Sequence, residues 1–260
     1  MEIINSKLIG TGACIPDFVL TNAMLEQMVD TNDEWIVQRT GVRERRIAKN
    51  THTWELALGA AQDALADAGI TAEKLDLILV STCSPDTNTP NTASILQDKL
   101  GARQVGAFDI NNACTGFVSA TDIADSYIKS GKAKTVLVVS AETLSRIVDY
   151  TDRSTCILFG DGAAAAVYQA TEDETVGILS TFTAADGSGA EYLHMEALPV
   201  EDPLSGDRTV DPKARFLKMQ GAPVVRFTAR AVPLAIDTAL KRAGVTAEEI
   251  DWVVPHQANL

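Results

Sequence analysis

Two residues in this sequence of 260 residues could together carry out nucleophilic chemistry on an acyl group, namely Cys114 and His256. Cys114 follows a strand-like apolar run at residues 105–110 and precedes an amphipathic segment at residues 117–129. A strand, a tight turn and a helix in this order place the thiol at a helix N-terminus, where the positive end of the helix dipole favours a thiolate of lowered pKa. The alternative is a buried cysteine that packs as a small apolar side chain.

His256 directly follows another apolar run, residues 252–255, which the sequence predicts to be a strand. A cysteine with a histidine beside it is the minimum set for attack of a thiolate on an acyl group. The other two histidines, His52 and His194, lie in loop-like segments. His256 is therefore the better partner for Cys114, and a purely structural role for it stays open.

The elements around these two residues alternate between strands and helices. Apolar runs of strand length occur at residues 75–82, 105–110 and 134–141, and helical periodicity occurs at residues 53–69, 90–100, 117–129 and 224–243. Strands this apolar are typical of a sheet covered on both faces. The pattern predicts an α/β architecture with a central sheet.

An internal repeat divides the chain. Residues 64–76 match residues 239–251 at eight of 13 positions, with a constant offset of 175. We interpret the match as a duplication, with coincidence in a common helix–glycine–strand connection as the alternative. Two related halves would bring Cys114 and His256 together where the halves meet.

The two copies continue for different lengths. The first runs on for about 90 residues beyond Asp76, whereas the second has nine residues beyond Asp251. We therefore expect an N-terminal half with the nucleophile at residues 1–170, and a loop region with an incomplete C-terminal half at residues 171–260. We also expect a C-terminal truncation of a longer protein.

The composition argues against several classes of protein. The chain is 46% hydrophobic with a net charge of −13, so its surface as a whole does not suit nucleic acid or an anionic membrane. It has no apolar run of 18 residues and no signal-peptide pattern. The four cysteines form no CxxC pair, and no histidine stands at metal-ligand spacing. We expect a cytoplasmic protein with reduced thiols, no metal and no other cofactor.

Four motifs of the chain resemble the beta-ketoacyl-acyl-carrier-protein synthase III family of the thiolase superfamily. They lie at residues 31–46, 112–117, 159–163 and 254–259, in the family's order and spacing. The resemblance implies a homodimer and a thiolase-like, duplicated α-β-α-β-α layered fold, whose second half is incomplete here. It also implies the initiating condensation of type II fatty acid synthesis. An acyl-CoA primer acylates a cysteine, and malonyl-acyl-carrier protein then condenses with it to give a 3-oxoacyl-acyl-carrier protein, CO2 and CoA.

By this resemblance Cys114 is the nucleophile and His256 is the histidine that assists decarboxylation. A neutral imidazole can donate a hydrogen bond to the thioester oxygen as enolate charge develops. The resemblance assigns CoA binding to Trp35, Arg39, Arg153, Thr31, Gly221 and Asn259, the acyl pocket to Thr89, Leu144 and Phe159, and carrier-protein docking to Arg226.

Each binding assignment has a plainer alternative. Trp35, Leu144 and Phe159 could simply pack in the core. Arg39 and Arg153 could form ion pairs with nearby carboxylates, and Thr31 could cap a helix. Arg226 could lie on a solvated helix face. Thr89 stands where some family members carry phenylalanine. Its smaller side chain would leave room for primers longer or more branched than acetyl.

The sequence also departs from the family. The Gly-Asn-Thr-Ser motif that holds the family's catalytic asparagine is absent, as is a glycine-rich segment that supplies an oxyanion-hole N–H. We therefore expect the 260-residue chain by itself to be inactive or crippled. The alternatives are a thiolase-superfamily condensing enzyme of secondary metabolism, and an inactive fragment or dimerisation partner.

Overall fold

The fold is built on one mixed sheet of five strands. The computed structural model describes residues 4–197, 204 and 211–258. The strands lie in the order β1 (Asn5–Cys14), β7 (Asp161–Thr171), β6 (Thr135–Thr143), β4 (Leu77–Ser81) and β5 (Gly106–Ile110). β4 runs parallel to β5 and β6, whereas β7 runs antiparallel to β6 and β1. The three parallel strands therefore end at one edge, which carries the loops of the candidate site.

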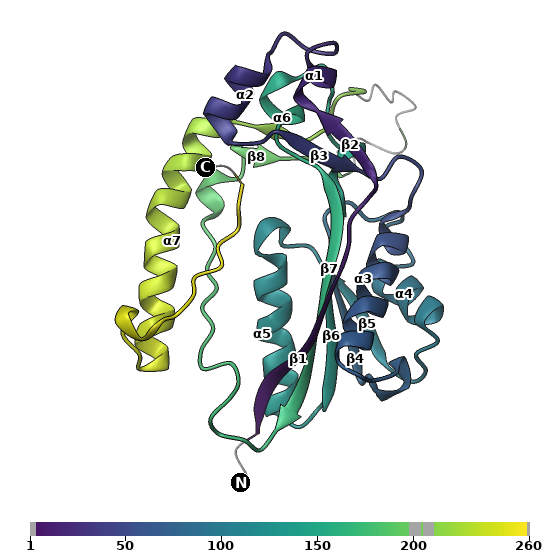
Figure 1. The fold of residues 1–260 in the computed structure, drawn as a ribbon, viewed down its shortest axis with the longest axis vertical. Helices are drawn as coiled ribbons and strands as arrows, with labels where there is room; N and C mark the ends of the chain where they lie inside the picture. The colour runs from purple at the N-terminus through teal and green to yellow at the C-terminus, as the bar shows by residue number, and fades with distance from the viewer. Residues whose placement is uncertain (1–3, 198–203, 205–210, 259–260) are drawn as a thin grey trace.

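Helices cover both faces of this sheet (Figure 1). α3 (Thr53–Asp67) and α4 (Thr92–Leu100) lie on one face, and α5 (Gly116–Lys129) lies on the other. β4 is buried at every position, which explains why it is an unbroken apolar run. The predicted α/β architecture with a covered central sheet is confirmed.

Smaller elements cap the edge where the parallel strands end (Figure 1). They are β2 (Phe18–Thr21), α1 (Asn22–Leu25), α2 (Asp33–Thr40), β3 (Glu44–Ile47) and α6 (Arg153–Cys156). The buried Arg45 of β3 joins them, because its guanidinium donates to the Asn22 side chain and to the Ile157 carbonyl. Arg45 therefore links α1 to the end of α6, and the Asn22 amide in turn donates to the Asp33 carboxylate of α2 (2.7 Å).

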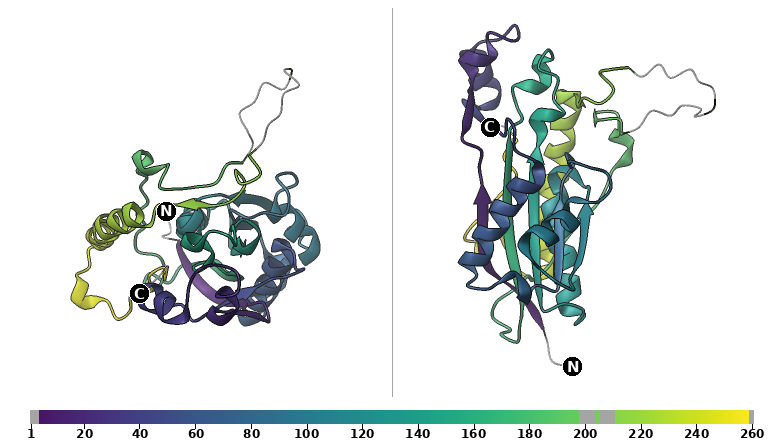
Figure 2. Two further views of the ribbon diagram at one scale, coloured as in Figure 1. Left: turned by 90° about the horizontal axis from the view of Figure 1, so that it is seen from above. Right: turned by 90° about the vertical axis from the view of Figure 1, so that its right-hand side faces the viewer.

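The long helix α7 (Gly221–Ala243) stands apart from the helices that pack on the sheet (Figures 1 and 2). The Ser180 hydroxyl donates to the Ala239 carbonyl (2.7 Å), and the Arg242 guanidinium donates to the Thr181 carbonyl (2.8 Å). The Thr181 hydroxyl in turn donates to the Asp122 carboxylate of α5 (2.6 Å). The connecting segment thus ties α7 to α5, although no residue of α7 is buried.

The remaining elements are short. They are the ladder of β8 (Leu193–His194) and β9 (Lys218–Met219), and single-turn 3-10 helices at Ala72–Lys74, Ala113–Thr115, Leu144–Arg146, Gly187–Gly189 and Ala247–Glu249. None of the helices within the described ranges combines the length and apolar character needed to cross a bilayer. The same residues contain no group of three or more histidine, cysteine or acidic side chains placed to hold a metal ion.

The two copies of the internal repeat fold alike at first and then differ. α3 and α7 are both followed by a glycine of positive φ, Gly69 at 65° and Gly244 at 71°. β4 then follows the first copy, whereas residues 252–257 after the second copy have no regular structure, and Trp252 is 86% exposed. The prediction of a strand at residues 252–255 is wrong, because no strand in the described part of the chain lies beside this segment to pair with it.

Candidate active site

Cys114 lies on a strained turn between β5 and α5. It is the middle residue of the 3-10 turn Ala113–Thr115, and Ala113 has a φ of 43°, which residues other than glycine rarely adopt. The Thr115 hydroxyl donates to the Asn112 carbonyl (2.9 Å), and the Asn112 amide donates to the Ser119 hydroxyl (2.7 Å). These contacts hold the strained backbone, and strain of this kind clusters at functional sites. The predicted place of Cys114, between a strand and a helix N-terminus, agrees with this geometry.

The pKa of the Cys114 thiol is raised, whereas the sequence predicts a lowered pKa. Its side chain is exposed at the surface, yet the protein around the sulfur removes enough water to raise the pKa of the thiol. Burial is the largest cause, its own backbone N–H lowers the pKa, and the carboxylate of Glu142 raises it. The expectation of a lowered pKa is therefore wrong, because lost hydration and the Glu142 charge raise the pKa of the thiol more than the Cys114 N–H lowers it.

Gly116 allows α5 to begin close to the end of β4. A Cβ atom on Gly116 would lie 1.8 Å from the hydroxyl oxygen of Ser81 and 3.0 Å from its Cβ. Only a residue without a side chain fits this gap. Gly116 therefore sets how closely the Cys114 turn approaches the sheet edge.

Trp35 is flanked by two arginines from different elements. The guanidinium carbon of Arg39, on α2, lies 5.2 Å from the ring centroid, and that of Arg153, on α6, lies 4.7 Å from it. Arg153 also donates to the Asp30 carbonyl (2.7 Å). Ion pairing does not explain these arginines, since neither forms a salt bridge with a described residue. An indole with two guanidinium groups close to it suits a purine that carries phosphates.

Thr31 lies beside this group with an unpaired hydroxyl. Its Oγ1 is buried and has no hydrogen-bond partner among the described residues. Asn32 caps α2 instead, because its side chain accepts a hydrogen bond from the Trp35 N–H (2.8 Å). The capping interpretation of Thr31 is wrong. A buried hydroxyl without a partner is costly, so this position suits a polar atom of a ligand.

His256 is exposed, and no hydrogen bond or ion pair joins it to Cys114 or to another described residue. The C-terminal segment that carries it runs back along α7 toward the end of the molecule that holds α2 (Figure 1). Asn259, the other candidate on this segment, lies outside the described residues. The pairing of His256 with Cys114 stays a prediction.

The other predicted binding residues lie on separate elements. Gly221 and Arg226 are exposed in the first two turns of α7, which begins near α2 (Figure 1). Thr89 is exposed in the loop before α4, and Leu144 is half-buried after β6. Phe159 packs against the buried cluster around Ile36 and Cys156, which favours a place in the core.

The sequence analysis missed a carboxylate close to Cys114. Glu142 is the second-to-last residue of strand β6. It accepts hydrogen bonds from the Cys83 N–H (2.9 Å), the Cys83 thiol (3.4 Å) and the Ser84 hydroxyl. Burial raises the pKa of Glu142, and burial with the Glu142 charge raises the pKa of Cys83 to about 12. The only sign of this carboxylate in the sequence was a single acidic residue directly after the apolar run at residues 134–141.

Comparisons with known proteins identify several similar chains. Residues 108–187 match the family model of 3-oxoacyl-acyl-carrier-protein synthase III. Beta-ketoacyl-acyl-carrier-protein synthase III of Clostridium novyi (strain NT) is 45% identical over 256 residues, which are 98% of this chain and 78% of that protein. The protein of the same name from Xanthomonas campestris pv. campestris (strain 8004) is 48% identical over 261 residues, 99% of this chain and 78% of that protein.

A solved structure agrees with the sequence relatives. The crystal structure of 3-oxoacyl-acyl-carrier-protein synthase III from Aquifex aeolicus VF5 has a TM-score of 0.89 to this chain at 46% identity. The match covers 98% of this chain and 77% of that one. Together these comparisons bear out the predicted thiolase-like fold. They do not confirm the expected C-terminal truncation.

Proposed function

This chain belongs to the beta-ketoacyl-acyl-carrier-protein synthase III family, and from this premise we propose which residues perform each part of the reaction. The relatives support an acyltransferase, the initiating condensing enzyme of fatty acid synthesis, and they do not favour the alternative in secondary metabolism. Its substrates are an acyl-CoA primer and malonyl-acyl-carrier protein.

Cys114 accepts the acyl group in the first step. The sulfur forms a bond to the thioester carbonyl carbon, the bond from that carbon to the CoA sulfur breaks, and the thiol proton ends on the departing CoA. The strained turn at Ala113 is the observation that carries this assignment, since it presents the thiol in front of the first turn of α5. The backbone N–H of Cys114 can stabilise the oxyanion.

His256 assists the second step. The carboxyl–carbon bond of the malonyl group breaks, CO2 leaves, and the resulting enolate attacks the acyl carbon while the bond to the Cys114 sulfur breaks. A neutral His256 donates a hydrogen bond to the thioester oxygen as the enolate forms. The physical support is the chemistry of imidazole and the place of His256 in the 254–259 motif.

CoA binds with its adenine beside Trp35 and its phosphates at Arg39 and Arg153. The two cation–π contacts of Trp35 support this assignment, as does the unpaired hydroxyl of Thr31. Gly221 and Asn259 are assigned to the pantetheine arm on the motif match alone.

Replacing Arg153 by alanine is expected to weaken CoA binding about tenfold, because it removes a charge-assisted phosphate contact and one side of the indole stack. Isothermal titration calorimetry with CoA measures the change. The exposed Arg103, in the loop after α4, is the matched control, and Arg103→Ala should bind CoA like the parent. Equal affinity of both variants would count against the assignment.

Gly116→Ala is expected to slow acylation of Cys114 about tenfold or more, because the new Cβ displaces the nucleophile turn from the sheet edge. Ser81→Ala removes the hydroxyl that the new Cβ would meet, so the double variant should recover much of the rate. Mass spectrometry after timed incubation with acetyl-CoA gives the rates. Equal loss in the single and double variants would show that this close approach does not set the geometry.

The remaining assignments rest on the family resemblance. Thr89, Leu144 and Phe159 line the acyl pocket, and the small Thr89 admits primers longer or more branched than acetyl. Arg226 docks the acidic carrier protein. The chain acts in the cytoplasm as a homodimer. Its nucleophile lies in an N-terminal half at residues 1–170, and its histidine lies in a loop region with an incomplete C-terminal half at residues 171–260.

Peptide mass mapping after incubation with acetyl-CoA tests the function. One acetyl group is expected on the peptide that contains Cys114, and none on the peptide that contains Cys83, whose thiol donates a hydrogen bond to the Glu142 carboxylate (3.4 Å). A chain that takes up no acetyl group, or takes it up elsewhere, would refute Cys114 as the acyl acceptor.

A further inference from the structure

A half-buried carboxylate with its hydrogen-bond donors lies behind the nucleophile turn, and the mechanism above assigns it no role. We define the Glu142 cluster as Glu142, Thr82, Cys83 and Ser84. The Glu142 carboxylate accepts from the Cys83 N–H (2.9 Å), the Cys83 thiol (3.4 Å), the Thr82 hydroxyl (3.4 Å) and the Ser84 hydroxyl. The carboxylate therefore has a fixed position at the ends of β4 and β6.

The Glu142 cluster is connected to the turn that carries Cys114. The Thr82 N–H donates to the carbonyl of Ile110, the last residue of β5 before the turn (3.1 Å). On the same side, Gly116 leaves no room for a side chain against Ser81, the residue before Thr82. The Ser84 hydroxyl also accepts from the Thr143 N–H (2.8 Å). The end of β4 and the loop after it therefore contact both ends of the turn that carries Cys114, and the same loop binds the Glu142 carboxylate.

Within the described part of the chain, the charge of Glu142 has no counter-ion. Its hydrogen-bond donors there are neutral, and no lysine, arginine or histidine there forms a salt bridge with it. The titratable groups facing it are Cys83, from the loop after β4, and Cys114, from the turn after β5. An uncompensated carboxylate at this place disfavours a second negative charge on either sulfur.

We propose that Glu142 is a positioning residue that keeps Cys114 in its thiol form until an acyl thioester occupies the site. This inference rests on the proposed role of Cys114 as acyl acceptor. The thiolate is the form that oxidants and alkylating agents attack, so a protonated thiol is protected in the empty site. When the thioester is attacked, negative charge moves from sulfur to the carbonyl oxygen, and the repulsion from Glu142 matters less.

The pH dependence of Cys114 alkylation by iodoacetamide, followed by peptide mass mapping, tests the proposal. Glu142→Gln keeps the size of the side chain and removes its charge. The alkylation profile should move to lower pH, and the rate at pH 7 should rise about threefold, since a larger thiolate fraction is partly offset by its lower nucleophilicity. Glu142→Asp keeps the charge, so its profile should stay near the parental midpoint even if the rate changes.

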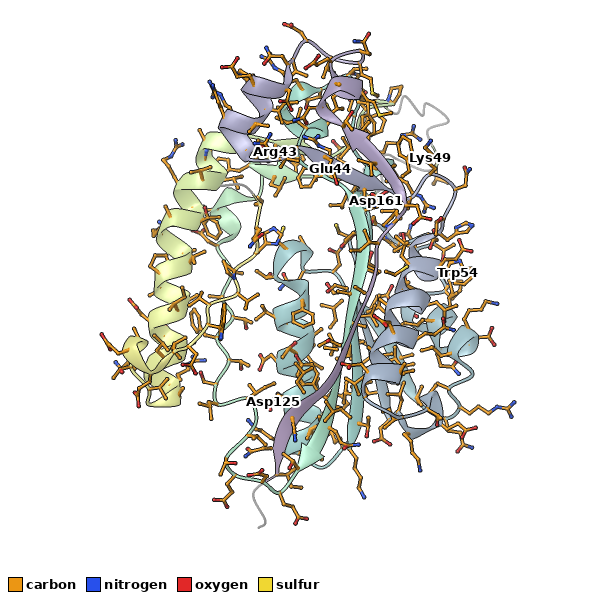
Figure 3. The ribbon with its side chains drawn as sticks, viewed as in Figure 1. Arg43, Glu44, Lys49, Trp54, Asp125 and Asp161 are labelled. Atoms are coloured by element: carbon orange, nitrogen blue, oxygen red, sulfur yellow. The ribbon has the colours of Figure 1, made fainter. Side chains whose placement is uncertain are left out.

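Asp161 supplies the matched control. It is a buried carboxylate at the start of β7 (Figure 3), and it accepts from the Ala48 N–H (2.7 Å), the Ser145 N–H (2.8 Å) and the Ser145 hydroxyl (2.6 Å). It anchors loops as Glu142 does, but it does not act on the pKa of Cys114. Asp161→Asn should leave the alkylation midpoint of Cys114 unchanged.

An unchanged midpoint in a folded Glu142→Gln variant would overturn the proposal and leave Glu142 a structural role only. Ser84→Ala is a second test if that variant does not fold. It removes a hydrogen bond that stabilises the charged carboxylate, so Glu142 takes up a proton at higher pH and Cys114 alkylation near that pH should increase. An unchanged profile there would equally reject the proposal. Alkylation needs no CoA, so these results are independent of whether Cys114 accepts an acyl group.

Discussion

Cys114→Ala is expected to abolish incorporation of the acetyl group from acetyl-CoA into this chain. The acyl-enzyme needs a sulfur nucleophile on the turn between β5 and α5, and alanine has none. The residues assigned to CoA lie on α2 and α6, so the same variant should still bind CoA with parental affinity. Intact mass spectrometry measures the first effect, and calorimetry with CoA measures the second.

Cys14→Ala is the matched control for this loss. Cys14 is a half-buried thiol at the end of β1, and it packs beside Gly59 of α3. Burial and the nearby Asp17 raise the pKa of Cys14, and this thiol lies at the end of β1, not on the turn that precedes α5. The Cys14→Ala chain should take up one acetyl group as the parent does. Residual acetylation of Cys114→Ala at the parental level would place the nucleophile elsewhere.

Gly12→Ala is expected to lower the free energy of unfolding by about 3 kcal/mol, which is a large part of the stability of a typical domain. A Cβ atom on Gly12 would lie 2.2 Å from the Ala64 backbone nitrogen and 2.4 Å from the Ala60 carbonyl oxygen. These atoms belong to the backbone of α3, so no side chain can rotate to make room. β1 and α3 would have to separate along their whole contact. Denaturant unfolding followed by circular dichroism measures the change.

Gly162→Ala, on the neighbouring strand β7, is the control for the loss of a glycine. The nearest atom to a Cβ there is the Cys14 carbonyl oxygen at 3.8 Å, an ordinary contact distance. The cost should therefore stay below about 1 kcal/mol. If the two substitutions destabilise the chain equally, close packing of β1 on α3 is not what makes Gly12 necessary.

The local part of the fold could be predicted from the sequence because its signals are short-range. The apolar runs that became β4, β5 and β6 and the periodic segments that became α3, α4 and α5 are properties of consecutive residues. The end of α3 at Gly69 could be predicted for the same reason. The prediction of a strand at residues 252–255 was wrong because a strand must pair with another strand, and an apolar run does not show whether one lies beside it.

The binding residues could be predicted only in part. The family resemblance selected Trp35, Arg39 and Arg153, and the structure shows that the two arginines contact the indole instead of nearby carboxylates. The choice between these contacts depends on how α2 and α6 are held together, through Asn22 and Arg45. Side chains 118 positions apart, such as Trp35 and Arg153, become neighbours only through that packing.

For the nucleophile, the sequence by itself determined where Cys114 lies in the order of elements, because the strand before it and the helix after it are encoded locally. Only the tertiary structure decided the state of its thiol. The parallel pairing of β4 with β6 brings Glu142 to Cys83, 59 residues away in the chain, and places that charge behind the turn. A pKa depends on burial and on charges close in space, so the expectation of an activated thiolate reversed once these neighbours were in place.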